Sequence, residues 1–268
     1  MRKVYLETNA ICRAQESNIS GTDLRQLLDE RELTPVVGLH AIYELARTFL
    51  NKKNTDIAIK LFTIINELSP EFSNQPGVLM SQEVNNCLSN GKIHSLLNGE
   101  EKQQTIEEVR KLSVGNFDDK ARAFIEARDN SFKIDHVKKS EHNIELFKKS
   151  PPSERVRTFE DVFAYYENDF PSLIIKIFND ALSEEIALAI IEKIDKYLTI
   201  RSNLRSQIYL MYVQLVQKAV PASDKVDDHR HIIEAAYCDA FITSDSQLIN
   251  NANKINPNLE IIGWNSLT

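Results

Sequence analysis

The chain has 268 residues, 42% hydrophobic and 26% charged, proportions typical of a soluble globular protein. This length suits one large domain or a domain that carries an insertion. A formal net charge of −7 and a pI near 5.5 argue against a broad basic surface for nucleic acid, although a local basic patch is compatible with them.

Membrane and secreted classes are not indicated either. No apolar run approaches the ~20 residues that a membrane-spanning helix needs. A strand pattern follows Met1-Arg2-Lys3 directly, so no secretory leader is expected. The three cysteines are widely scattered and form neither a zinc pattern nor a disulfide framework. We therefore expect a cytoplasmic protein without membrane contact.

Strands and helices alternate in the first 68 residues. The predicted elements are a strand at Val4 to Thr8, a helix at Asp23 to Arg31, a strand at Leu33 to Val37, and helices at Leu39 to Asn51 and Thr55 to Leu68. Gly38 allows the chain to turn from the second strand into the next helix. Glu44 lies off the apolar stripe of that helix, so it is expected to face outward or toward a cleft.

Residues 70–220 have a different character. No glycine occurs between Gly115 and Gly263, and strand signals are missing. Helix-period runs are predicted at Thr105 to Leu112, Asp118 to Phe147, Phe159 to Tyr166, Leu173 to Phe178, Glu184 to Leu198 and Asn203 to Val220. A compact domain does not carry a structureless loop of this length. We therefore predict an all-helical insertion at 70–220, whose scattered basic residues form either a solvated surface or a phosphate-contacting face.

A helix and two strands are predicted after the insertion. The helix runs from about Asp228 to Tyr237, with Asp227 as its N-cap, and the strands are Ala240 to Thr243 and Leu259 to Ile262. Asp228 is then in the first turn of the helix, and Asp245 follows a buried strand. Ligands of open α/β sheets bind at the carboxyl ends of the strands.

Four carboxylates occupy such positions: Glu7 after the first strand, Glu44 on a helix, Asp228, and Asp245. Hard oxygen ligands suit Mg²⁺ or Mn²⁺ better than Zn²⁺. Such an ion would lower the pKa of a water ligand and neutralise phosphate oxygens. The four residues are therefore predicted to be catalytic metal ligands.

The two histidines of the predicted helix at 228–237 raise a zinc hypothesis. Positions two apart on a helix point to different faces, so His229 and His231 cannot easily share one ion. We expect His231, one turn after Asp228, to flank the cleft and to contact substrate, and His229 to be solvated.

Three short segments carry a family resemblance. Leu6-Glu7-Thr8-Asn9 resembles the Leu-Asp-Thr-Asn that opens PIN domains, and Ala41 to Arg47 resembles their second-helix segment, whose Glu is a metal ligand. The run Asp228 to Asp245, with Asp239-x-Phe-x-Thr243-x-Asp, is similar to the closing PIN segment. The resemblance covers roughly residues 1–68 and 222–268, and it departs from the family at Glu7, where Asp is usual.

The resemblance implies a three-layer α/β fold with a central, mainly parallel sheet, with 1–69 and 221–268 as the nuclease core. It implies that Asn9 or Thr243 helps to orient the carboxylates or water. Asp239, just before the predicted strand, is expected to cap or brace the site or to be a further ligand. Arg47, one turn beyond Glu44, is expected to contact substrate phosphate, to pair with Glu44, or to be a surface residue without a special task. The implied activity is metal-dependent endoribonuclease cleavage. The family's toxin members are shorter and are held by antitoxins, so we expect a specialised or defence-linked enzyme with an inhibitory or regulatory protein partner. An inactive binding module, favoured by Glu7, and a DNA nuclease of flap-endonuclease type remain alternatives.

Overall fold

The computed structural model describes residues 1–129, 157–217, 219 and 223–267. Most of the helical run predicted at Asp118 to Phe147 lies outside these residues, and residues 119–129 form its described, helical part. Of the basic residues scattered through 70–220, those at positions 138, 139, 148, 149 and 155 also lie outside the described residues.

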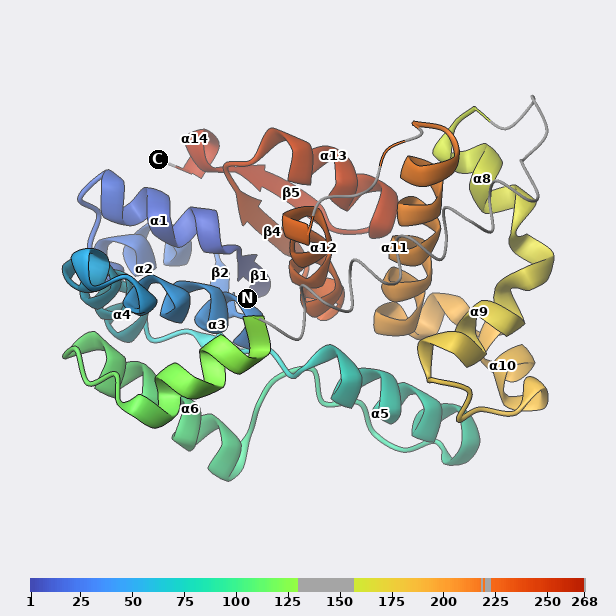
Figure 1. Ribbon diagram of the computed structural model, residues 1–268, viewed down its shortest axis with the longest axis horizontal. Coiled ribbons are helices and arrows are strands. Elements are labelled where there is room, and N and C mark those ends of the chain that lie inside the picture. Colours follow the sequence, from blue (N-terminus) through green and yellow to red (C-terminus); the bar gives the residue numbers. More distant parts are fainter. Residues whose placement is uncertain (130–156, 218, 220–222, 268) are drawn as a thin grey trace.

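A single five-stranded sheet crosses the middle of the protein (Figure 1). Its strands are β1 (Arg2–Leu6), β2 (Leu33–Val37), β3 (Glu71–Phe72), β4 (Ala240–Thr243) and β5 (Glu260–Gly263). They pair in the order β3-β2-β1-β4-β5, and every pairing is parallel. The predicted mainly parallel α/β sheet is therefore confirmed.

The longer helices account for most of the remaining described chain. They are α1 (Thr8–Glu16), α2 (Gly21–Asp29), α3 (Leu39–Arg47), α4 (Thr55–Leu68), α5 (Pro76–Ser89), α6 (Gly99–Ser113), α8 (Phe159–Tyr165), α9 (Phe170–Ile177), α10 (Glu184–Ile191), α11 (Leu198–Leu215), α12 (Ser223–Glu234) and α13 (Ser246–Ile255), with the short α14 (Trp264–Leu267) near the end. Short 3-10 turns lie at Thr48–Leu50, Lys52–Asn54, Glu167–Asp169, Ile194–Lys196 and Ala235–Tyr237.

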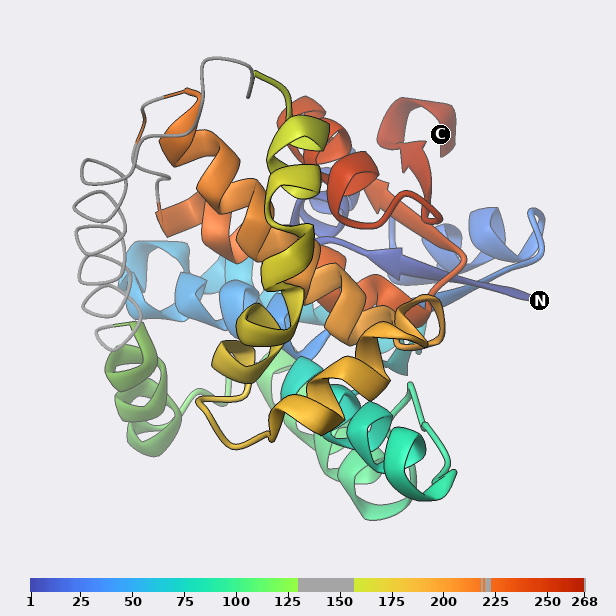
Figure 2. The same cartoon turned by 90° about the vertical axis from the view of Figure 1, so that its right-hand side faces the viewer.

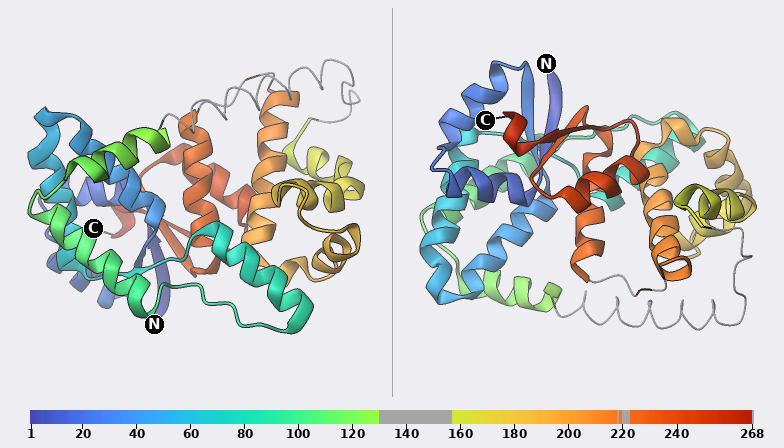
Figure 3. Two further views of the ribbon diagram at one scale, coloured as in Figure 1. Left: turned by 60° about the horizontal axis from the view of Figure 1, so that its bottom comes forward. Right: turned by 90° about the horizontal axis from the view of Figure 1, so that it is seen from above.

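Both faces of the sheet are covered, because alternate strand residues point to opposite sides. Val4 and Leu6 of β1 belong to one core, with α1, α2, α4 and α6. Tyr5 of β1 and Phe241 of β4 belong to the other core, with α5 and α8 to α13. Seen from above, these two helical layers lie on opposite sides of the strands (Figure 3). The result is a three-layer α/β architecture.

The helices of the predicted insertion are built into these layers. α6 packs along α4 in the first core, and α11 lies against α12 and α13 in the second. Figure 2 shows α8 to α11 covering the sheet from the side that faces the viewer. The prediction of an all-helical segment is wrong at its beginning, because β3 extends the sheet beside β2 through residues 71 and 72.

Two local predictions also need correction. Helix α12 begins at Ser223, so Asp228 lies in its second turn rather than its first. Asp227 is consequently inside the helix, where it pairs with Arg230 at 3.0 Å, and it is not the N-cap. Helices α1, α5 and α13 were not predicted from the sequence.

Candidate functional site

The candidate site lies at the carboxyl ends of β1 and β4, the two neighbouring strands in the middle of the sheet. The chain crosses from β1 to β2 on one side, whereas β4 and β5 extend the sheet on the other. The strand order therefore reverses between β1 and β4, and ligands of open α/β sheets bind at such switch points.

Glu7 follows β1 and is almost fully buried, with 3% of its surface exposed. Its Oε2 atom accepts a hydrogen bond of 3.1 Å from the Thr243 hydroxyl at the end of β4. Burial raises the pKa of Glu7, and the charge of His231 and the backbone N–H of Asn9 oppose that rise. The carboxylate is therefore held in one orientation by groups from both strands.

Asp245 follows β4 and begins α13. Its Oδ1 atom accepts the backbone N–H groups of Gln247 and Leu248 at 2.7 and 3.1 Å, as an N-cap does. The Thr243 hydroxyl accepts the backbone N–H of Asp245 at 3.0 Å. Thr243 thus links Glu7 to Asp245, and Oδ2 of Asp245 remains outside the capping bonds.

Asp228 approaches the same place from α12. Burial raises its pKa to about 7, and the negative charges of Asp245, Glu7 and Glu44 add to the effect. All four predicted carboxylates therefore lie close enough to repel one another. Two of them, Glu7 and Asp245, follow strand ends, and the other two, Glu44 and Asp228, lie inside helices.

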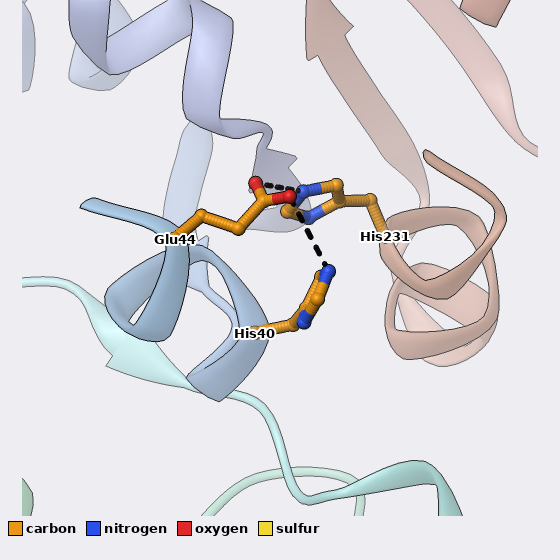
Figure 4. A group of neighbouring side chains, drawn as sticks. All are labelled: His40, Glu44 and His231. Atoms are coloured by element: carbon orange, nitrogen blue, oxygen red, sulfur yellow. Dashed lines mark hydrogen bonds and ion pairs between the residues drawn. The ribbon is translucent and has the colours of Figure 1, made fainter. Parts of the chain in front are cut away.

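Glu44 lies at the centre of a hydrogen-bonded group, which Figure 4 draws in part. Its Oε2 atom accepts from the Thr8 hydroxyl at 2.5 Å and lies 2.8 Å from Nε2 of His231. Its Oε1 atom lies 3.5 Å from Nε2 of His40. Burial opposes the charge of Glu44, but hydrogen bonds and positive charge from the two histidines outweigh it and hold its pKa well below the ordinary value.

The ring of His231 is buried between Glu44 and a second carboxylate. Its Nδ1 atom lies 2.9 Å from the Tyr5 hydroxyl, which donates to Oε2 of Glu234 at 2.8 Å. Burial disfavours the charged ring, but Glu44 outweighs this and raises the pKa of His231 to about 9. In the absence of a metal ion, His231 and Glu44 form an ion pair below that pH.

Glu234 also fixes the start of α3. Its Oε1 atom accepts the backbone N–H of His40 at 3.1 Å, near the positive end of the helix. Gly38 lies directly against this group, because a Cβ atom there would overlap Oε2 of Glu234 and the Tyr5 hydroxyl. Burial raises the pKa of Glu234 to about 7.

An open depression of about 330 Å³ adjoins Asp245. It is lined by Asn9, Cys12, Arg13, Glu16, Ser244, Asp245 and Ser246. Asn9 is exposed, so its side chain faces the depression while its backbone contacts Glu7. Of the four candidate carboxylates, Asp245 is the one that lines this opening.

Several predicted site residues lie elsewhere. Asp239 is at the opposite, amino-terminal end of β4, where its Oδ2 atom accepts the backbone N–H of Lys3 at 2.7 Å, so it cannot be a ligand of this site. Arg47 pairs with Asp129 at 3.1 Å rather than with Glu44. His229 is not solvated, because it is 1% exposed and bonds to Ser206 at 2.9 Å. His231 is 1% exposed, so it contacts Glu44 from inside the protein and does not offer a surface to substrate.

Sequence reasoning missed three members of the site: Tyr5, His40 and Glu234. The spacing His40-x-x-x-Glu44, one helical turn, could have indicated that both side chains share a helix face. Tyr5 and Glu234 carry no local signal, since only the packing of α12 against β1 brings them together.

The donor set suits a hard divalent cation. Carboxylates that raise one another's pKa are stabilised by a positive ion between them. Among the described residues, only His40, Glu44 and His231 bring three candidate ligand atoms within 4.8 Å of one another. Glu7, Asp228 and Asp245 do not belong to such a group, and their charges affect one another over longer distances.

In comparisons with known proteins, no protein-family model, no curated protein and no solved structure matches this chain. Among the described residues, no helix is both long enough and apolar enough to cross a membrane.

Proposed function

We propose that the chain is a PIN-like, Mg²⁺- or Mn²⁺-dependent nuclease that hydrolyses phosphodiester bonds, most readily those of RNA. The observation that carries this proposal is the convergence of Glu7, Glu44, Asp228 and Asp245 at the switch point of a parallel sheet. A bound divalent ion would neutralise phosphate oxygens and lower the pKa of a water ligand.

The residues of the chain have separable tasks in this proposal. Asp245 lines the opening and would hold the ion together with Asp228 and Glu7. Thr243 keeps the Glu7 carboxylate and the start of α13 in fixed relation through its two hydrogen bonds. Thr8 and His231 orient Glu44 from the buried side. The depression beside Asn9 and Asp245 would receive the polynucleotide backbone.

RNA as the substrate rests on the resemblance of the strand and helix motifs to PIN domains, and so does a regulatory protein partner. A DNA nuclease would use the same carboxylates. The site geometry therefore does not distinguish RNA from DNA as the substrate, and a cleavage assay is needed to do so.

The test is incubation of the purified chain with end-labelled RNA and DNA in Mg²⁺, in Mn²⁺ and in EDTA. We expect cleavage of RNA that EDTA abolishes and that Asp245→Asn slows at least about 100-fold, because a ligand is lost. Asp239→Asn is a matched control at the other end of β4 and should cut at the wild-type rate. Cleavage by Asp245→Asn at the wild-type rate would contradict the proposal, whereas cleavage of DNA alone would change the substrate.

One observation favours a second candidate, a non-catalytic binding module. Glu44 is already paired with His231 and hydrogen-bonded by Thr8, so part of its charge is satisfied without a metal ion. A module of this kind would bind RNA or a protein partner without cutting, and its affinity would not change in EDTA. The same assay, extended by a gel-shift measurement, separates the two candidates.

A further inference from the structure

Two imidazole rings, those of His40 and His231, meet the carboxylate of Glu44. Nε2 of His231 lies 2.8 Å from Oε2 of Glu44, and Nε2 of His40 lies 3.5 Å from Oε1. Figure 4 shows the His40 ring, from the same helix as Glu44, and the His231 ring, from α12, both directed toward the Glu44 carboxylate. Ligands about 2.0–2.1 Å from a tetrahedral Zn²⁺ are about 3.3 Å apart, and the two observed distances lie on either side of that value.

His40 supplies an independent observation. Only 2% of its surface is exposed, its Nδ1 atom has no hydrogen-bond partner within the described residues, and its Nε2 atom has only the 3.5 Å pairing with Glu44. A buried polar group without a partner costs roughly 1–3 kcal/mol. The ring also packs against the rings of Tyr43 and His231, and an ion between His40 and Glu44 would give its Nε2 atom a stronger partner.

The surroundings of His231 orient its lone pair. The Tyr5 hydroxyl donates to Glu234, so its oxygen is free to accept the Nδ1–H of His231. A histidine that donates through Nδ1 presents Nε2 toward Glu44 and His40. Metal-binding histidines commonly have such a hydrogen-bonded partner on the far nitrogen, and it fixes both tautomer and ring orientation.

We propose that His40, Glu44 and His231 form a second metal site, which binds a first-row transition-metal ion such as Zn²⁺ or Co²⁺ and shares Glu44 with the carboxylate site. Two imidazoles and one carboxylate favour such ions over Mg²⁺, which prefers oxygen ligands alone. The two histidines close the buried side, and Glu44, with 19% of its side chain exposed, joins the site to the carboxylate opening. Water and substrate would complete the coordination from that side.

The site does not depend on the proposed nuclease activity, because its donors would bind metal in an enzyme or in a binding module. The probe is Co²⁺ added to the untagged chain in a non-coordinating buffer, followed by visible absorption, which reports nitrogen and oxygen coordination directly. We expect one bound Co²⁺ per chain with absorption bands of a low-symmetry site, displaced by Zn²⁺ and not by excess Mg²⁺.

Two variants test the donors. His40→Ala removes one of the three donors, so Co²⁺ affinity should fall at least about 100-fold, and a thermal melt checks that the fold persists. Tyr5→Phe keeps all three donors and removes the partner of Nδ1 together with the hydrogen bond to Glu234, so it should weaken binding about 10- to 100-fold. His94→Ala, at an exposed histidine, is the control and should bind as wild type does.

The outcomes separate this site from the nuclease. Asp245→Asn should lose cleavage but retain the Co²⁺ spectrum. Wild-type protein without a Co²⁺ band, or equal Co²⁺ affinity in wild type, His40→Ala and Tyr5→Phe, would overturn the second site even if RNA is cleaved. A Co²⁺ spectrum without any cleavage would support this site and contradict the nuclease.

Discussion

Replacing Asp228 by Asn should stabilise the metal-free protein at neutral and alkaline pH. Burial and the charges of Asp245, Glu7 and Glu44 raise the pKa of Asp228 from 3.8 to about 7. The folded protein therefore binds the proton of this carboxyl more tightly than the unfolded chain does. Its contribution to stability is fully present below about pH 3.8 and is lost as the pH rises through about 7.

The magnitude follows from the same shift. A change from 3.8 to about 7 corresponds to at most roughly 4 kcal/mol, and solvent screening of this half-buried group reduces it to about 1–2 kcal/mol. Since 1 kcal/mol moves the melting temperature of a chain of this size by roughly 2–4 °C, Asp228→Asn should raise it by about 2–8 °C at pH 8.

The assay is thermal unfolding of both proteins in EDTA at pH 4 and pH 8. The gain should be largest at pH 8 and small at pH 4, where Asp228 is protonated in the folded protein and only about half ionised in the unfolded chain. Asp239→Asn, at the other end of β4, is the control and should show no such dependence on pH. A lower melting temperature for Asp228→Asn at pH 8, or an equal gain at both pH values, would refute the argument that the carboxylates repel one another.

Three further substitutions test the site. Glu7→Gln should cleave RNA at least about 100-fold more slowly than wild type, whereas Glu7→Asp should cleave at the wild-type rate or faster. A wild-type protein that binds metal but cleaves RNA more slowly than both variants would contradict this. Thr243→Val should slow cleavage about 10- to 100-fold, because it removes the bond to Glu7, and an unchanged rate would show that the hydroxyl is dispensable. Gly38→Ala should destabilise the fold by about 1–3 kcal/mol in urea unfolding, because a Cβ meets Glu234 and Tyr5, whereas Gly77→Ala, with open space around it, should cost nothing.

The main strands could be predicted because buried strands consist mostly of apolar residues. β2 was predicted with its observed bounds and β4 likewise, and both are short apolar runs with buried residues. β3 consists of two residues only, Glu71 and Phe72, which is too short for any periodicity. Its pairing with β2 follows from the position of the chain after α4 and not from its own side chains.

Helix bounds were less predictable where charges dominate. α12 begins five residues before Asp228, in a segment rich in Asp and Lys that carries no apolar stripe. α1 begins at Thr8, immediately after Glu7, and its apolar positions are too few for a clear helical period. Both helices are stabilised mainly by what they pack against.

In the candidate site too, some residues could be predicted from local sequence and others only from the packing of distant segments. The carboxylates could be proposed because each follows a recognisable strand or helix motif. The roles of Thr243 and Glu44 depended on which side chains meet across β1, β4, α3 and α12, and the pairing of His231 with Tyr5 joins residues 226 positions apart. Asp239 precedes the predicted strand at Ala240 to Thr243, so its position at the amino end of that strand already separated it from a site at the carboxyl ends.

The most direct test of the central claim, that the carboxylates form one divalent-ion site, is calorimetric titration with Mg²⁺. Mg²⁺ is the suitable probe because it selects oxygen ligands over the two histidines. Wild type and the control Asp239→Asn should each bind one Mg²⁺ per chain, and the double variant Asp228→Asn/Asp245→Asn should bind none in the same concentration range. Equal binding by the double variant, or no binding by wild type, would contradict the account.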